Sequence, residues 1–244
     1  MRGGSFIAFI SALAFVIVAF IVGGAYNYKF KTRNTVSVAG SANYNFTADL
    51  IVWSASFDRS SMDIKEAYAA LKNDAKQIND YLTSHGITNT EIVFSSVDID
   101  KLFENTFNEE GRQTGNVFKG YKLKQTVKIE SKNIDNVEKI SREITELLQS
   151  GIELSSQEPM YYYTKLADLK LTLLAQAAAD AFNRANTIAR NAHSKLGDLR
   201  RANMGVFQIT GQYSNESYTY SGAYNTSSKN KTANVIVRME YELD

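Results

Sequence analysis

The sequence predicts an α+β fold in which mixed, largely antiparallel sheets pack against amphipathic helices after an apolar N-terminal segment. Segments with apolar side chains at every second position are mixed with segments of helical period, without the regular βαβ order of a parallel sheet. The other strand positions are mostly polar, which is typical of antiparallel sheets with one face toward water. The soluble part, residues 29–244, is long enough for one large domain or two small ones.

An uncharged apolar segment precedes this domain. No charged side chain lies between Arg2 and Lys29, and residues 5–25 are apolar apart from two serines. At about 1.5 Å of rise per residue, a helix of this length spans roughly the 30 Å hydrocarbon core of a bilayer. We therefore expect residues 1–28 to form a transmembrane anchor. A cleaved signal peptide is the alternative, because residues 23–25 (GGA) form a small-residue sequence like a cleavage site.

The charged residues indicate neither a compartment nor a partner. The basic residues after the apolar segment, Lys29, Lys31 and Arg33, favour a cytoplasmic domain on their own, but long domains are translocated largely regardless of flanking charge. Lys and Arg number 27 and Asp and Glu 26, so a nucleic-acid partner is not expected. The chain has no cysteine, so disulfide usage cannot indicate the compartment.

The first half of the domain is predicted to contain two pairs of strands with a helix between them. Residues 35–44 and 50–57 are expected to form the first strand pair. An amphipathic helix should begin at Ser60, with Asp63 three residues later as in a capping box, and end at Gly86. Residues 91–103 and 121–130 then predict a hairpin, and the polar residues 104–116 between them predict an exposed connection.

The second half is predicted to contain two helices and three strands. A helix over residues 137–148 should end at Gly151, and a short strand around Leu154 follows. The longest helix is expected over residues 164–194, with one face formed by Leu166, Leu169, Leu173, Ala177, Ala181, Ala185, Ile188 and Ala192. A strand through Val206 and Ile209, a loop over residues 211–231 and a final strand complete the chain. The final strand has an apolar face made of Val235, Val237, Met239, Tyr241 and Leu243.

Residues suited to catalysis or metal binding are few. With no cysteine and only two histidines, thiol catalysis is excluded, and a catalytic triad would have to use His85 or His193. Both are interpreted as structural residues near helix ends, without a partner at the spacing of a helical zinc site. Asp98 and Asp100 share one strand face and could in principle hold a cation, but the sequence lacks the glycine and further carboxylates of a calcium loop. We expect no catalytic residue, cofactor or metal ion.

A tyrosine-rich segment is the strongest candidate for an interaction site. Residues 212–231 are rich in Tyr, Ser, Asn and Gly, and their tyrosines are Tyr213, Tyr218, Tyr220 and Tyr224. Tyrosine is a rigid amphipathic group that makes contacts at a low entropic cost. Two interpretations stay open: a contact with another subunit or partner, and a mobile hairpin tip.

An ordered series of short segments resembles the bacterial SIMPL-domain family. These segments are residues 36–40 (VSVAG), 48–49, 66–67, 86–87, 95–96, 120–121, 178–181 (AADA), 184–185, 188–189 and 196–197. The residues 52–54 (VWS) and 94–97 (FSSV) are similar to those of membrane-anchored members from Bacteroidetes-type bacteria. The family usually has proline where Ala48 stands and glycine where His193 stands, so the chain can differ locally at these two places.

The resemblance implies a two-part α+β domain in the bacterial cell envelope, a link to stress tolerance and, in at least one branch, a large ring-like homo-oligomer. It implies no catalytic residues. We therefore expect a non-enzymatic protein, anchored in the bacterial inner membrane with its domain in the periplasm, that acts by homo-oligomeric assembly or by binding a partner. A ligand-binding module with a pocket between its two parts, for a small molecule that the sequence does not indicate, is the second alternative, and a hydrolase is the third.

Overall fold

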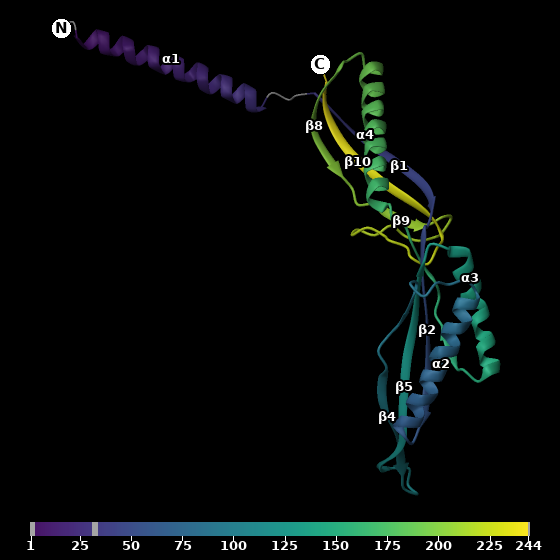
Figure 1. The fold of residues 1–244 in the computed structure, drawn as a ribbon. Helices are drawn as coiled ribbons and strands as arrows, with labels where there is room; N and C mark the ends of the chain where they lie inside the picture. The colour runs from purple at the N-terminus through teal and green to yellow at the C-terminus, as the bar shows by residue number, and fades with distance from the viewer. Residues whose placement is uncertain (1–2, 31–33, 244) are drawn as a thin grey trace. The chain divides into compact units, whose positions relative to one another are not determined.

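The computed structural model describes the backbone of residues 3–30 and 34–243 and the side chains of residues 12–26 and 34–243 (Figure 1). In chain order its elements are α1 (Gly3–Phe30), β1 (Thr35–Thr47), β2 (Leu50–Ser61), α2 (Ile64–Ser84), β3 (Ile92–Phe94), β4 (Asp98–Phe107), β5 (Gln113–Ser131), α3 (Ile134–Glu143), the 3-10 helix η1 (Ile144–Ser150), β6 (Leu154–Ser156), β7 (Met160–Tyr162), α4 (Leu166–Asn191), β8 (Leu196–Met204), β9 (Gln208–Gly211) and β10 (Asn230–Leu243). The predicted α+β class is confirmed.

The helix α1 contains the apolar segment that opens the chain. It runs for 28 residues, and the large apolar side chains of residues 12–26 are exposed. Residues 5–11 of the expected membrane span lie outside the described side chains. Over the part of the chain that the structure describes, no helix has both the length and the apolar character that crossing a membrane requires.

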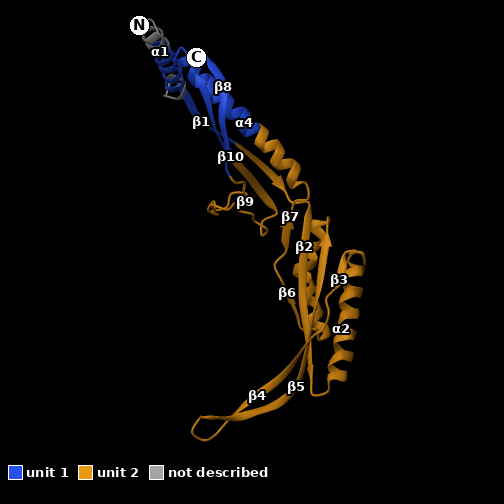
Figure 2. Cartoon of the chain, turned by 90° about the vertical axis from the view of Figure 1, so that its left-hand side faces the viewer, with its two compact units in different colours: residues 1–41, 176–205, 236–244 blue, residues 42–175, 206–235 orange. Residues whose placement is uncertain are grey.

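The chain folds into two compact units (Figure 2). Unit 1 contains residues 1–41, 176–205 and 236–244, and unit 2 contains residues 42–175 and 206–235. Unit 1 is thus built from three segments that are distant in the sequence and unit 2 from two, and β1, α4 and β10 each supply residues to both units.

Unit 2 is built on an antiparallel sheet with the order β3-β5-β2-β6, in which β4 also pairs with β5 and β7 with β2. Its apolar face packs on α2, α3 and η1, and Trp53, Phe57, Leu71 and Ile78 are buried there. The indole of Trp53 donates a hydrogen bond to Ser156 Oγ at 3.0 Å, so the largest core side chain has a partner for its polar atom. Beyond the end of β2, β4 and β5 continue as a two-stranded arm (Figure 2).

A second, four-stranded sheet places β10 between β1 and β8, with β9 also paired to β10, and in unit 1 α4 packs on one face of it. The buried stripe of α4 is formed by small side chains, Ala177, Ala181 and Ala185. A Cβ atom added at Gly40 of β1 would lie 2.2 Å from Ala177 O and 2.3 Å from Ala181 N. The alanine stripe and Gly40 together therefore bring the helix backbone directly against the strand.

Two predictions about the strands are wrong, one about a pairing and one about the extent of a strand. The strands β1 and β2 do not pair with each other, because β1 joins β10 and β2 joins β5. Residues 91–103 do not form one strand, since β3 ends at Phe94 and β4 begins at Asp98. The predicted hairpin is confirmed, but most of residues 104–116 belongs to its strands, and only residues 108–112 form the turn. Polar residues are accommodated in the strands here because the arm is exposed on both faces.

Three further details differ from the prediction: the start of one helix, the buried face of another and one strand. Asp63, not Ser60, is the N-cap of α2, and its carboxylate accepts a hydrogen bond from Lys65 N, because β2 continues to Ser61. On α4, Ile188 is 47% exposed and Ala189 is buried instead, so the buried stripe turns around the helix along the twisted sheet. The strand β8 was not predicted, because its residues show no apolar alternation.

Candidate functional site

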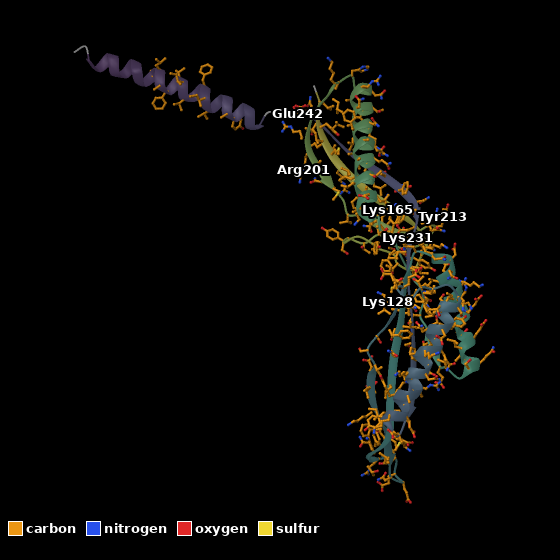
Figure 3. All side chains as sticks on the ribbon, viewed as in Figure 1. Lys128, Lys165, Arg201, Tyr213, Lys231 and Glu242 are labelled. Atoms are coloured by element: carbon orange, nitrogen blue, oxygen red, sulfur yellow. The ribbon has the colours of Figure 1, made fainter. Side chains whose placement is uncertain are left out.

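The candidate site is the loop that joins β9 to β10, residues 212–229, which we call the tyrosine loop. Its four tyrosines differ in exposure. Tyr213 and Tyr220 are almost fully exposed, at 94% and 102%, whereas Tyr218 is 59% and Tyr224 45% exposed. Figure 3 labels Tyr213 and the buried Lys231 in this part of unit 2. The site therefore presents two whole aromatic side chains to solvent.

Gln208, the first residue of β9, holds the middle of the tyrosine loop. Its side chain is buried, and its Nε2 donates to Thr219 O at 2.8 Å. Its Oε1 accepts from Thr219 N at 3.2 Å and from Ala223 N at 2.8 Å. One buried amide thus satisfies three backbone groups of the loop, as a neighbouring strand would.

Lys231, at the start of β10, holds the end of the loop. The residue is fully buried, and its Nζ donates to Asn225 O at 2.6 Å and to Asn225 Oδ1 at 3.2 Å. The side-chain amide of Asn225 also donates to Glu216 Oε1. Burial lowers the pKa of Lys231 to about 8, although the carboxylate of Glu216 acts in the opposite direction. Asn225 therefore links a buried cation to an anion within the loop.

Backbone contacts complete the arrangement. Ile209 N donates to Ala223 O at 2.8 Å, and Asn225 N donates to Ile209 O at 2.9 Å, so the loop adds a short parallel bridge to β9. Gly222 has a φ of 95°, and Tyr213 has a φ of 61°, a left-handed conformation that costs a non-glycine residue about 1 kcal/mol or more. The exposed side chain of Tyr213 does not offset this cost by packing. Hydrogen bonds thus tie the middle and the end of the loop to β9 and β10, while the choice between a contact surface and a mobile hairpin tip stays a prediction.

A hollow of about 340 Å³ lies beside the tyrosine loop. Its lining includes Leu166 and Lys170 of α4, Phe207, Ile209 and Tyr224. The Lys170 ammonium lies 5.5 Å from the centre of the Phe207 ring, and burial raises the pKa of Tyr224. The hollow thus combines apolar walls with one cation at its edge.

Comparison with protein families places this geometry in a known domain. The model of the SIMPL family, described as "Protein of unknown function (DUF541)", matches residues 36–240. The chain belongs to the SIMPL family. The match begins in β1, ends in β10 and includes the whole tyrosine loop, so the resemblance deduced from the sequence is confirmed. No curated protein matches the chain.

Within the described part of the SIMPL domain, the two histidines lie at helix ends. His85 follows α2, and its Nδ1 lies 2.8 Å from Tyr81 O while its ring stacks on Tyr81. His193 follows α4 with a φ of 57°. Neither histidine belongs to a group of three His, Asp or Glu side chains that could bind a metal ion, since the described residues contain no such group.

Asp98 and Asp100 of β4 are exposed and lie opposite Lys124 and Lys122 of β5. Alternating carboxylates and ammonium groups are typical of a solvated strand face rather than a cation site. Asp98 and Asp100 thus lie on a solvent-exposed strand face where lysines stand opposite them.

Sequence reasoning missed Gln208, Glu216 and Lys231, the three residues that hold the loop. For Lys231 the sequence held a signal of burial, because the residue precedes Ala233 and Val235 at the same two-residue spacing and so belongs to the buried face of β10. For Gln208 and Glu216 no signal was present, since only the folded loop brings their partners near them: backbone atoms for Gln208, and Gly211 N and the Asn225 amide for Glu216.

Proposed function

We propose that this SIMPL-domain protein is a non-catalytic, membrane-anchored protein of the cell envelope that works by homo-oligomeric assembly, with the tyrosine loop as a contact surface. The observation that carries the proposal is the nearly complete exposure of Tyr213 and Tyr220 on a loop whose conformation is held by buried Gln208 and Lys231. Exposed aromatic side chains on an ordered loop are typical of residues that are buried at the centre of a protein–protein interface.

The physical reason is the entropy of association. Ordering a loop when subunits meet opposes binding, and a loop that is already ordered avoids this cost. The hydrogen bonds of Gln208 and Lys231 are made within one chain, so the loop has its conformation before any subunit contact. A tyrosine that acts as a hot spot of such an interface contributes about 2 kcal/mol.

The uncharged apolar sequence of residues 5–25, part of which lies outside the described side chains, is the support for a membrane anchor in this proposal. A helix retained in the bacterial inner membrane would confine the SIMPL domains to one plane, and this confinement raises their effective concentration. The periplasmic side and a link to stress tolerance follow from the family resemblance. Resistance of the full chain to extraction from membranes by carbonate tests the anchor, and a mature chain that begins near Tyr26 would contradict it.

Sedimentation velocity of the full chain in mild detergent tests the assembly. We expect an oligomer, and replacing the four loop tyrosines by serine should weaken it tenfold or more, because about 1.4 kcal/mol corresponds to a factor of ten. Tyr68→Ser is the control, since this tyrosine is 52% exposed on α2, away from the loop. A chain that stays monomeric at high micromolar concentration contradicts the assembly, whereas an oligomer unchanged by the loop variant contradicts only the role of the loop.

The hollow beside the loop supports a second candidate function, the binding of a small ligand. Apolar walls from Phe207, Ile209 and Tyr224 with the ammonium of Lys170 at the edge suit an apolar carboxylic acid. Octanoate and benzoate should then raise the melting temperature of the wild type more than that of Lys170→Gln. Equal shifts for both proteins would contradict a specific site.

A further inference from the structure

The sheet β1-β10-β8 has two open edges. The strand β10 is bordered by β1 on one side and by β8 on the other, and neither β1 nor β8 has a further partner among the described residues along unit 1. An open edge presents backbone donors and acceptors that pair readily with another chain. These two edges are therefore surfaces on which a partner strand can add.

The edge of β1 faces a groove beside α4. Ser41 N donates to Asp180 Oδ2 at 2.9 Å and not to β10, so the backbone of Ser41 points away from the sheet. Residues 35–42 alternate without interruption, so Ser37 and Ala39 direct their N–H and C=O groups the same way. Both residues line a groove of about 620 Å³, whose other wall includes Arg184 and Ile188 of α4.

The edge of β8 carries side chains that suit this groove. In its ladder with β10, Leu199, Ala202 and Met204 lie opposite Tyr241, Met239 and Val237, on the face that packs on α4. Leu199 is nevertheless 50% exposed and Met204 57% exposed. Arg201 and Asn203 lie on the opposite face. The irregular register of β8 on β10 thus brings apolar side chains that do not alternate in the sequence onto one face, and the helix of the same chain leaves Leu199 and Met204 half exposed there.

We propose that β8 of a second copy of this chain adds to the edge of β1, so that Leu199 and Met204 of the neighbour pack in the groove beside Ile188. This inference rests on the proposed homo-oligomeric function and states which strands join the subunits. Within one chain β1 and β8 both run antiparallel to β10 and so parallel to each other. In a ring whose axis runs along the strands, the neighbour's β8 keeps this direction and runs parallel to β1.

A head-to-tail pairing of β1 with β8 explains both open edges at once. Pairing β1 with β1, or β8 with β8, would leave the other strand of every subunit unpaired, whereas the head-to-tail contact repeats and closes into a ring when the rotation allows it. The fit of charge agrees, because Ser37 and Ala39 of β1 are uncharged and do not repel Asp198 or Arg201 of the neighbour.

Disulfide trapping tests this pairing in the full chain, which has no cysteine of its own. Cells co-express one tagged chain carrying Ser37→Cys and another carrying Asp198→Cys, Arg201→Cys or Asn203→Cys, and their membranes are oxidised. We expect a mixed disulfide dimer for at least one of the three pairs. Asn116→Cys, on the exposed arm of unit 2, replaces the β8 cysteine as the control for random collision.

The outcomes separate this inference from the proposed function. Cross-linking of Ser37→Cys chains with each other, of β8 cysteines with each other, or equal cross-linking with Asn116→Cys would overturn the pairing. An oligomer in sedimentation without any mixed disulfide would also overturn it while leaving the assembly intact. Ala39→Pro gives a second measurement, since proline removes an outward N–H group of β1. This variant should lower the mass of the oligomer, whereas Ala39→Ser should leave it unchanged. Equal masses for the two variants would contradict the pairing.

Discussion

The ammonium group of Lys231 lies 2.6 Å from the backbone oxygen of Asn225, and no part of this lysine is exposed to solvent. A fully buried lysine is rare in proteins, because its ammonium group must find hydrogen-bond partners to offset the loss of water. Here the bonds join the start of β10 to the tyrosine loop. The stability of this loop should therefore depend on the protonation of a single amine.

Titration of Lys231 should make stability rise with pH. Burial lowers its pKa from 10.5 to about 8, so between these pH values the unfolded chain binds a proton that the folded chain has lost, and the free energy of unfolding increases. Below about pH 8 the contribution does not change. Denaturant unfolding at several pH values should show this rise in the difference between wild type and Lys231→Met.

Lys229 provides the matched control for this titration. Its hydrogen bond to Asp135 raises its pKa, so the difference between wild type and Lys229→Met should not increase over the same pH range. A flat difference for Lys231→Met as well would show that the amine of Lys231 is not shielded from water.

Gly40→Ala should destabilise the domain by about 2–4 kcal/mol, as substitutions that overpack a core do. The new Cβ would lie 2.2 Å and 2.3 Å from backbone atoms of α4, and backbone cannot rotate away as a side chain can. Chemical denaturation measures the loss. Gly115→Ala is the control, because its Cβ would meet Thr106 Oγ1 at an ordinary 3.5 Å; a loss of similar size there would point to a general cost of alanine in strands.

Asp74→Ala should destabilise unit 2 by about 2–3 kcal/mol. Asp74 is buried and accepts from Arg59 Nη2 at 3.0 Å, while the same guanidinium donates to Gly151 O at 2.7 Å. Removing the carboxylate leaves a partly covered cation without its partner. The exposed pair Lys76–Asp80 is the comparison, and Asp80→Ala should cost only about 0.3–0.5 kcal/mol. Equal costs would mean that burial does not strengthen the Arg59–Asp74 pair.

Gln208→Leu should release the tyrosine loop without unfolding the sheets. The amides of Thr219 and Ala223 lose their acceptor, so their hydrogen exchange should become faster while that of β2 and β5 is unchanged. Gln212→Leu is the control, because only the backbone of Gln212 has a bond, to Asn230 O at 2.9 Å. Unchanged exchange at Thr219 in Gln208→Leu would mean that the loop is held by other contacts.

Much of the local structure could be predicted because periodicity reports which face of an element is buried. The apolar face of β10 and the alanine stripe of α4 followed from spacing alone, and Gly151, with a φ of 77°, ends its helical segment where a glycine was expected. The tyrosines of the candidate site followed from composition. Their exposure and the groups that hold them did not, because the hydrogen bonds of Gln208, Glu216 and Lys231 depend on the irregular path of the loop, which has no period in the sequence.

The sequence by itself determined the α+β class, the faces of its regular elements and the family. The tertiary structure decided that β1 pairs with β10 and not with its neighbour β2, and that β8 is a strand at all. A period of two defines the side of a strand that is buried but not its partner, which depends on the free energy of the whole fold. A strand such as β8, exposed on both faces within one chain, leaves no periodic signal, and only its hydrogen bonds to β10 define it.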